Sequence, residues 1–418
     1  MTPSSPTDAT RSAASPAARL RRTLRWIGLG AVTGVLAGLS SAGFLVTLEK
    51  VTELRVAHPW LLWLLPVGGF AVGLAYQRLA GRASGGNALI LDEIHQPSAW
   101  IPRRMAPLVY LGTEITHLFG GSAGREGTAL QMSGSLTDAV SRRLHLDQED
   151  RRTMLVAALG GGFGAVFGVP LAGIAFGIEV QSVRHLRTRA LLPSVVAALV
   201  GDRVVRLLGV HHTATPQLER IDWSLPLVAK VALAGVAFGL TAHAFVLATH
   251  GVKGALAARV GWSPLRPAVG GVAVILLTGA VGTHDYLGLS IPLIESSLAG
   301  GAGVVGAAFA LKLLFTAVTL GSGFQGGEVT PLFVIGATLG VTLGRALGVP
   351  VELLAAVGFV GVFAGAANVP VACTVMGAEL FGVHGVPLFA VACAASWAVS
   401  HPHGIYGARP EGDGTMAA

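Results

Sequence analysis

Charged residues are scarce in this sequence, because only 12% of its 418 residues are Asp, Glu, Lys or Arg whereas 52% are hydrophobic. Soluble domains carry about 25% charged residues. This scarcity excludes an ordinary soluble domain and is typical of a protein that crosses a membrane several times. Cysteine is also rare, and both examples, Cys373 and Cys393, lie in apolar segments. Their spacing fits neither a disulfide framework nor a metal site, so we interpret them as packing residues.

An HExxH zinc motif is absent from the sequence. An intramembrane enzyme would need paired metal ligands, or a nucleophile with a base, at the depth of the membrane. We therefore expect no enzymatic activity, no metal and no cofactor, and keep an intramembrane enzyme only as a disfavoured alternative.

Positive charge gathers at the start of the chain and in short loops. Four arginines lie within eight residues before the first apolar run, at Arg19, Arg21, Arg22 and Arg25. The positive-inside rule places this end in the cytoplasm, together with the basic stretches at residues 103–104, 142–152 and 184–189. The net charge of +7 thus indicates membrane topology, and no nucleic-acid partner is expected.

Apolar runs long enough to cross a bilayer are frequent in the chain. They occupy residues 26–47, 60–79, 153–178, 191–208 and 225–248, and residues 302–402 are apolar nearly throughout. Shorter or interrupted runs, which we interpret as partial or re-entrant spans, occupy residues 105–119, 291–298 and 331–347. The 58 glycines permit close helix packing and unwound segments that line a cavity. The sequence therefore predicts an all-α, polytopic membrane protein with broken helices in a lipid bilayer.

Residues 120–135 place two charges, Arg125 and Glu126, inside a run of small residues. Charges at membrane depth are expensive and indicate a functional site. Gly124 and Gly127 flank the pair, and Thr128 begins a stretch that reads as a helix. The free N–H groups at a helix start attract anions, so this stretch predicts an anion seat.

The same design recurs about 200 residues later, which indicates an internal repeat. The segment GSAGREGTA corresponds to GSGFQGGEVTP, and this alignment pairs Glu126 with Glu328. Further pairs at nearly the same offset are Asn87 with Ser290, Pro170 with Pro370, and Glu179 with Glu379. Two related halves with broken helices are typical of transporters that bind their ligand where the halves meet.

The repeat divides the chain into four predicted parts. A disordered basic arm covers residues 1–24, and a short tail covers residues 407–418. The two membrane repeats between them cover residues 25–210 and 211–406, and we expect them to have inverted topology.

From about residue 26 to Tyr406 the chain resembles the CLC family of chloride channels and proton-coupled anion antiporters. The resemblance lies in GGNAL at residues 85–89, GREGT at 124–128, GVPLAGIAFGIE ending at Glu179, and GGEVTP at 326–331. It implies that Glu126 is the gating glutamate, that Tyr406 coordinates the anion, and that the protein is a homodimer with one pathway in each subunit.

Departures from the common family pattern are similar to the fluoride-specific branch. Asn87 replaces the chloride-binding serine, Thr128 replaces a proline, and the second motif carries Glu328 and Thr330. Val180 stands where the family has its internal proton-transfer glutamate. The resemblance implies a fluoride/proton antiporter of the bacterial inner membrane, with fluoride and protons as its partners. A chloride or other small-anion transporter or channel of the same fold stays open as the alternative.

The residue chemistry agrees with this interpretation. Fluoride is strongly hydrated and needs good donors at short range, which the Asn87 amide, the backbone N–H groups of Val329 and Thr330, and the Tyr406 hydroxyl can supply. Glu126 is the candidate movable gate, and Glu328 the candidate second proton carrier. The supporting motif residues are Gly124, Arg125, Gly127, Thr128, Gly326 and Gly327.

Several simpler roles stay open. Asn87 and Glu328 could each cap a helix, and Glu126 could serve only as the partner of Arg125. Glu179 and Glu379 resemble a structural pair at equivalent helix ends. Glu114 and His117, one turn apart, have no assigned role.

Overall fold

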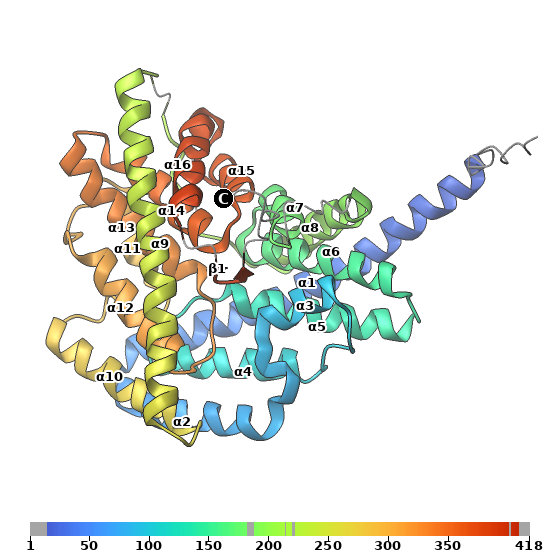
Figure 1. Cartoon of the computed structure of the whole chain (residues 1–418), viewed down its shortest axis with the longest axis horizontal. Helices are drawn as coiled ribbons and strands as arrows, with labels where there is room; N and C mark the ends of the chain where they lie inside the picture. The colour runs from blue at the N-terminus through green and yellow to red at the C-terminus, as the bar shows by residue number, and fades with distance from the viewer. Residues whose placement is uncertain (1–14, 182–187, 214, 220–221, 401–402, 409–418) are drawn as a thin grey trace, which may run out of the picture.

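The computed structural model describes residues 15–181, 188–213, 215–219, 222–400 and 403–408. Residues 1–14 of the predicted arm, 409–418 of the predicted tail and most of the basic loop predicted at 184–189 lie outside the described residues. Figure 1 shows the two halves of the chain, blue to green and yellow to red, largely on opposite sides of the molecule.

Helices form nearly all of the described chain. The first half contains α1 (Pro16–Ala57), α2 (Leu65–Ala75), α3 (Gly86–His95), α4 (Met105–Leu118), α5 (Glu126–Arg143), α6 (Gln148–Phe167), α7 (Pro170–Glu179) and α8 (Thr188–Leu207). Short helical segments, η1 (Pro59–Leu64), η2 (Tyr76–Ala80) and η3 (Gly81–Gly85), link α1, α2 and α3.

The second half repeats this order. It contains α9 (Leu225–Arg259), α10 (Leu265–Val281), α11 (Ile291–Leu298), α12 (Ala308–Gly321), α13 (Val329–Leu347), α14 (Val351–Ala367), α15 (Pro370–Phe381), η5 (Val383–Gly385) and α16 (Val386–Val399). The all-α class is confirmed, with one small addition: a hairpin of β1 (His403–Gly404) and β2 (Gly407–Ala408).

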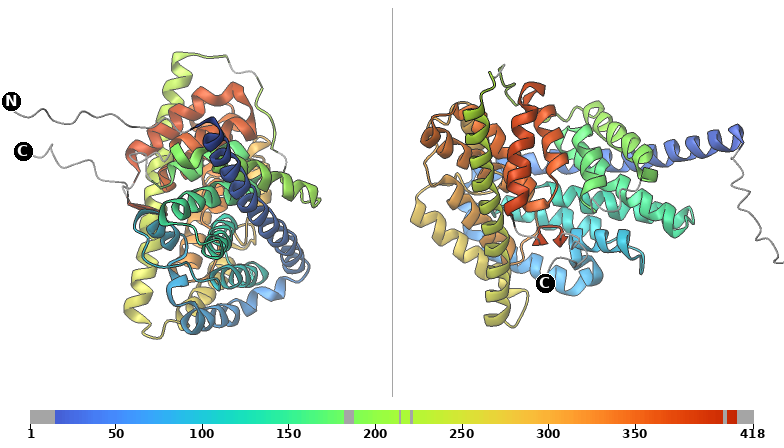
Figure 2. Two further views of the ribbon diagram at one scale, coloured as in Figure 1. Left: turned by 90° about the vertical axis from the view of Figure 1, so that its right-hand side faces the viewer. Right: turned by 45° about the horizontal axis from the view of Figure 1, so that its top comes forward.

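The first helix begins earlier than predicted. The Ser15 hydroxyl accepts a hydrogen bond from the Ala18 N–H (3.3 Å), and Pro16 occupies the first helical position. Both features favour a helix start, so the prediction of a disordered arm is wrong for residues 16–24. Figure 2 shows these first turns projecting from the helical body.

The span predicted at residues 153–178 is broken into two helices. Gly168 ends α6 in a left-handed conformation (φ 73°), and Pro170 then opens α7. The second half breaks in the same way, because Asn368 (φ 59°) ends α14 and Pro370 opens α15. The positive φ and the proline each prevent a continuous helix.

Four helical stretches of the described residues are long and apolar enough to cross a membrane. They are Pro16–Ala57, Pro59–His95, Leu225–Arg259 and Val329–Leu347. Helices α4 and α11, with 14 and 8 residues, are short as predicted. Residues 331–347 belong to the 19-residue α13, which by length and composition is long enough to cross a membrane.

Small residues let equivalent helices of both halves pack closely. A Cβ added at Gly34 of α1 would come within 2.7 Å of the Ala197 carbonyl oxygen of α8. In the second half, a Cβ at Gly235 of α9 would come within 2.8 Å of the Ala392 carbonyl oxygen of α16. Glycine therefore sets the helix spacing where packing, rather than water exclusion, drives association.

Candidate functional site

The two repeated motifs meet through their backbones. The Gly124 N–H donates to the Gly327 carbonyl (2.6 Å), and the Gly327 N–H donates to the Gly124 carbonyl (2.7 Å). A Cβ at Gly327 would lie only 2.9 Å from the backbone nitrogens of Glu126 and Gly127, so only glycine allows this approach. The bridge places the starts of α5 and α13 side by side, although they lie about 200 residues apart in the sequence.

Glu126 is the first residue of α5 and is fully buried, yet its carboxylate binds the other half of the chain. It accepts hydrogen bonds from the Thr330 N–H (3.1 Å), from the Thr330 hydroxyl and from the backbone N–H of the preceding residue, Arg125 (3.1 Å). The carboxylate therefore occupies a seat of donors at the start of α13. The same donors would stabilise a bound anion at this position.

The Arg125 guanidinium makes no close hydrogen bond to the Glu126 carboxylate, although the two groups carry opposite charges. Its Nε lies 3.6 Å from a Glu126 oxygen, and this nitrogen has no hydrogen-bond partner among the described residues. The closest side-chain contact of Glu126 is with the Thr330 hydroxyl and not with the Arg125 guanidinium. Glu126 is therefore more than a structural partner of Arg125.

Asn87 lies against the start of α5, as predicted. Its amide nitrogen would be 3.1 Å from a Cβ at Gly127, and its buried amide oxygen has no hydrogen-bond partner among the described residues. Gly85 precedes α3, and no side chain caps this helix. The helix-cap alternative for Asn87 is therefore wrong. Thr128, by contrast, binds the Thr113 hydroxyl (2.7 Å) and joins α5 to α4.

Glu328 precedes α13 but makes no side-chain capping hydrogen bond. The helix-cap alternative is therefore wrong for this residue too. Its half-buried carboxylate follows Gly327 directly, so the two acids flank the same glycine bridge. Val329 and Thr330, next along the chain, are buried at the start of α13.

Tyr406 comes from the far end of the chain and completes this neighbourhood. The Ile405 N–H donates to the Ala366 carbonyl (2.8 Å), which fixes the β1–β2 hairpin against α14. The Tyr406 ring packs edge-on against Phe176 (5.7 Å between centroids), and its hydroxyl lies in the field of both Glu126 and Glu328. Figure 1 shows the hairpin between the two halves.

The family assignment follows from comparisons with known proteins. Residues 68–401 match the family described as "Voltage gated chloride channel". The chain belongs to this family, the CLC family. It is similar to a "Chloride/fluoride channel protein" of Pseudomonas syringae pv. tomato, with 47% identity over 93% of this chain and 87% of that protein.

More distant relatives agree with this CLC membership. An "H(+)/Cl(-) exchange transporter ClcA" of Cronobacter sakazakii is 28% identical over 76% of this chain and 72% of that protein. A solved structure titled "Crystal structure of a CLC-type fluoride/proton antiporter" superposes with a TM-score of 0.89, at 31% identity, over 94% of this chain and 98% of that chain. The fold, with its inverted repeats and broken helices, is the CLC membrane fold, and the chain is an integral, multi-pass membrane protein.

Two further acids of this CLC chain have structural contacts. Glu179, at the end of α7, accepts from the Val371 and Ala372 N–H groups (3.0 and 2.7 Å) at the start of α15. Glu379, in α15, accepts in return from the Leu171 and Ala172 N–H groups (2.9 and 2.6 Å) of α7. Each acid caps a helix of the other half, so the structural interpretation of this pair fits the contacts.

The segment GGSAG at residues 120–124 fits the GxSxG pattern of serine hydrolases, which bears on the enzyme alternative. The Ser122 hydroxyl pairs with the Thr316 hydroxyl (2.9 Å), and the His117 Nε2 faces the Gly124 carbonyl (3.3 Å). Ser122 therefore lacks the paired base of a catalytic serine.

Sequence reasoning missed Lys312 and the aromatic packing around the site. Lys312 is fully buried in α12, and a lysine inside the long apolar run was the available signal. Phe333 of α13 stacks on Phe359 (4.0 Å between centroids) and meets Phe363 (5.5 Å). Phe333 lies in the first turns of α13, so these rings place apolar structure beside the site, which strengthens electrostatic interactions there.

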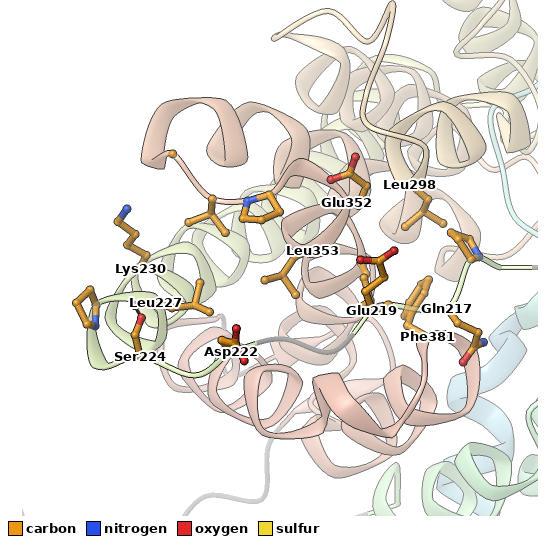
Figure 3. A pocket seen from close by; sticks show the side chains of 17 residues that line it. Gln217, Glu219, Asp222, Ser224, Leu227, Lys230, Leu298, Glu352, Leu353 and Phe381 are labelled. Carbon is orange, nitrogen blue, oxygen red and sulfur yellow. Dashed lines mark hydrogen bonds between the residues drawn. The ribbon is translucent and has the colours of Figure 1, made fainter.

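A cavity of about 830 Å³ lies away from these residues (Figure 3). It is bordered by the starts of α9 and α14 and by Phe381 of α15. Glu219, Asp222 and Glu352 line it together with Lys230. Three carboxylates beside one ammonium group disfavour an anion, so this cavity is not the candidate site.

Proposed function

We propose that this CLC chain is a fluoride/proton antiporter that exports fluoride from the cytoplasm, with Glu126 as its gate. The observation that carries the proposal is the seat of the Glu126 carboxylate on the Thr330 N–H and hydroxyl. A proton on Glu126 removes the charge that holds it there. The side chain then leaves, and a small anion takes the same donors.

The donors around this seat support fluoride as the anion. Fluoride gains most from short, strong hydrogen bonds, because its dehydration is costly. Asn87 and Thr330 supply neutral donors from opposite halves, and neither brings a fixed cation that would hold the ion too tightly to release it. The names of two similar proteins, a chloride/fluoride channel protein and a CLC-type fluoride/proton antiporter, agree with this choice.

Glu328 is the proposed second proton carrier. It flanks the glycine bridge opposite Glu126 and makes no capping hydrogen bond, so its carboxylate is free to exchange a proton. Val180, which cannot carry a proton, directly follows the last residue of α7. Glu328 supplies the titratable group that this position lacks.

The proposal includes the cellular setting. The basic start of α1 faces the cytoplasm of a bacterium, the helices cross the inner membrane, and two subunits form a homodimer with one pathway each. We propose a transporter without enzymatic activity.

Efflux from reconstituted vesicles tests the function. Vesicles are loaded separately with fluoride and chloride, and an ion electrode and a pH probe follow the anion and the proton. Fluoride should leave faster than chloride and in step with proton entry. Equal chloride efflux would instead support a general small-anion transporter, and fluoride efflux without proton movement would indicate a channel.

A further inference from the structure

A second cavity lies at the opposite end of α1 from its basic start. It measures about 480 Å³ and is lined by Arg55, Asp285, Leu287, Ser290 and the start of α11. We call it the outer vestibule. Helix α1 has 42 residues and is therefore about 60 Å long. With the basic start of α1 in the cytoplasm, as proposed above, the vestibule opens on the outer side.

Two positively charged side chains beside the vestibule, Arg55 and Lys312, form no ion pair within the described part of the chain. Lys312 is fully buried, and its ammonium donates to the Gly288 carbonyl (2.7 Å) and the Ser290 hydroxyl (2.9 Å). The Arg55 Nε is buried without a hydrogen-bond partner among the described residues. None of the ion pairs found in the described part of the chain involves Arg55 or Lys312. Buried charge of one sign is costly without a counter-ion.

A small niche lies between these groups, where Gly288 lacks a side chain. The point that a Cβ of Gly288 would occupy lies 3.4 Å from the Arg55 Nη2 and 3.7 Å from the His117 Nδ1. His117 is 1% exposed, and its Nδ1 has no partner among the described residues. The Arg55 Nη2 of α1 and the His117 Nδ1 of α4 therefore both border the point at which Gly288 lacks a side chain.

The two nitrogens differ in what they offer. Arg55 donates only, which suits an anion. The His117 Nε2 faces the Gly124 carbonyl (3.3 Å) and must donate there, so Nδ1 of the neutral ring is an acceptor. An anion alone would meet this lone pair. An anion that arrives with a proton would meet an Nδ1–H donor instead.

We propose that the Gly288 niche binds one small monovalent anion together with one proton. The anion accepts from Arg55, and the proton, taken from water, resides on the His117 Nδ1. This inference deepens the proposed function, because it gives the exported anion a staging site on the outer side of the gate loop.

Charge counting supports the joint binding. The positive charges of Arg55 in α1, Lys312 in α12 and Arg125 before α5 all oppose a proton on His117 when no anion is bound. A proton on His117 adds a fourth positive charge, which an anion in the niche balances. Among the described acids near this position, Asp285 is exposed at the vestibule rim, and Glu126 is held by Thr330. Glu114, one turn before His117 in α4, is buried and accepts from the Thr47 hydroxyl (2.7 Å). Binding of the anion and of the proton must therefore strengthen each other.

The test uses the full chain carrying Glu126→Gln, which removes proton exchange at the central seat. Calorimetric titration with potassium fluoride in two buffers of different ionisation enthalpy gives the protons taken up per anion bound. The niche predicts uptake of about one proton per chain on saturation with fluoride. Adding His117→Gln, which keeps a donor for the Gly124 carbonyl, should abolish that uptake. Absence of proton uptake in the Glu126→Gln protein would overturn the proposal.

Matched variants distinguish binding in the Gly288 niche from a general effect of the protein's positive charge. Arg55→Gln in the same background should weaken the proton-linked event about tenfold, as expected for loss of a charge-assisted hydrogen bond, and Arg55→Lys should restore part of it. Lys230→Gln, which removes one positive charge beside the other cavity, should change nothing. Equal weakening by Lys230→Gln and Arg55→Gln would refute the niche. Elution of each variant at the parent's volume confirms folding.

Chloride titrations keep this proposal distinct from the proposed function. If vesicle efflux showed no preference for fluoride, the function above would fail. Proton-linked binding of chloride at Arg55 and His117 would then still support the niche, because binding requires no turnover.

Discussion

Two pairs of repeated glutamates have diverged to different extents. Glu179 and Glu379 keep the same task, since each binds two backbone N–H groups at the start of a helix in the other half. Glu126 and Glu328 do not, because Glu126 is fully buried on Thr330 whereas Glu328 makes no capping hydrogen bond. Symmetry is retained where the acids hold the halves together and is lost where we propose that they move.

The Asn87 and Ser290 pair shows the same divergence. Asn87 lies against Gly127 of α5, and its amide oxygen has no partner among the described residues, whereas Ser290 accepts from Lys312 beside the outer vestibule. Inverted repeats place these equivalent positions on opposite sides of the site. We propose that this asymmetry lets the two ends of one pathway perform different tasks.

The largest expected effect is a difference between substitutions of the two central acids, Glu126 and Glu328. Glu126→Gln should reduce proton-coupled fluoride efflux by about 100-fold or more, because the neutral side chain cannot exchange a proton with the seat. Glu328→Gln should slow coupled efflux less, because Glu328 does not occupy the seat. Both are measured as initial efflux rates from vesicles with equal amounts of protein. Equal losses in the two variants would contradict the different roles.

The capping acids should instead behave alike. Glu179→Gln and Glu379→Gln should each lower the free energy of unfolding by about 1–3 kcal/mol, because each leaves two charge-assisted hydrogen bonds weakened. Thermal unfolding in detergent measures the effect, and efflux per folded protein should stay near the wild-type value. A marked efflux loss in only one variant would show that this pair is not purely structural.

Thr330→Val tests the seat from the other side. The variant keeps the backbone N–H but loses the hydroxyl that donates to Glu126, so coupled efflux should change by about tenfold. Thr113→Val is a suitable control, because its hydroxyl binds Thr128 and not the seat. Similar effects of both variants would indicate a general packing defect.

The smallest expected effect concerns selectivity. Asn87→Ser should lower the ratio of fluoride to chloride efflux about tenfold or less, because a hydroxyl offers one donor where the amide offers two. Competition between the two anions in the same vesicles measures this ratio. An unchanged ratio would remove Asn87 from the selectivity argument.

The sequence contained enough to predict the halves and their meeting point. The common offset of the Glu126 and Glu328 motifs and of the Glu179 and Glu379 pair indicated two repeats, and the glycine-rich motif predicted an anion seat at a helix start. These features depend on local residues and spacing. The CLC resemblance supplied the positions of Asn87 and Tyr406.

Contacts between distant segments could not be predicted in the same way. Nothing local shows that Glu126 binds Thr330 of the other half, or that Lys312 binds the loop at Gly288. The break at Gly168 and Pro170 was visible in the sequence but was outweighed by the apolar length of residues 153–178. Hydropathy reports the length of a buried segment, whereas the positive φ of Gly168 decides where the helix ends.

The central claim is that an anion and the Glu126 carboxylate compete for one seat at the start of α13. Fluoride titration of the purified wild-type and Glu126→Gln proteins, by calorimetry in buffers of different ionisation enthalpy, tests it most directly. The account predicts that the wild-type chain takes up about one proton more than the variant on saturation with fluoride. Equal proton uptake by the two proteins would contradict it.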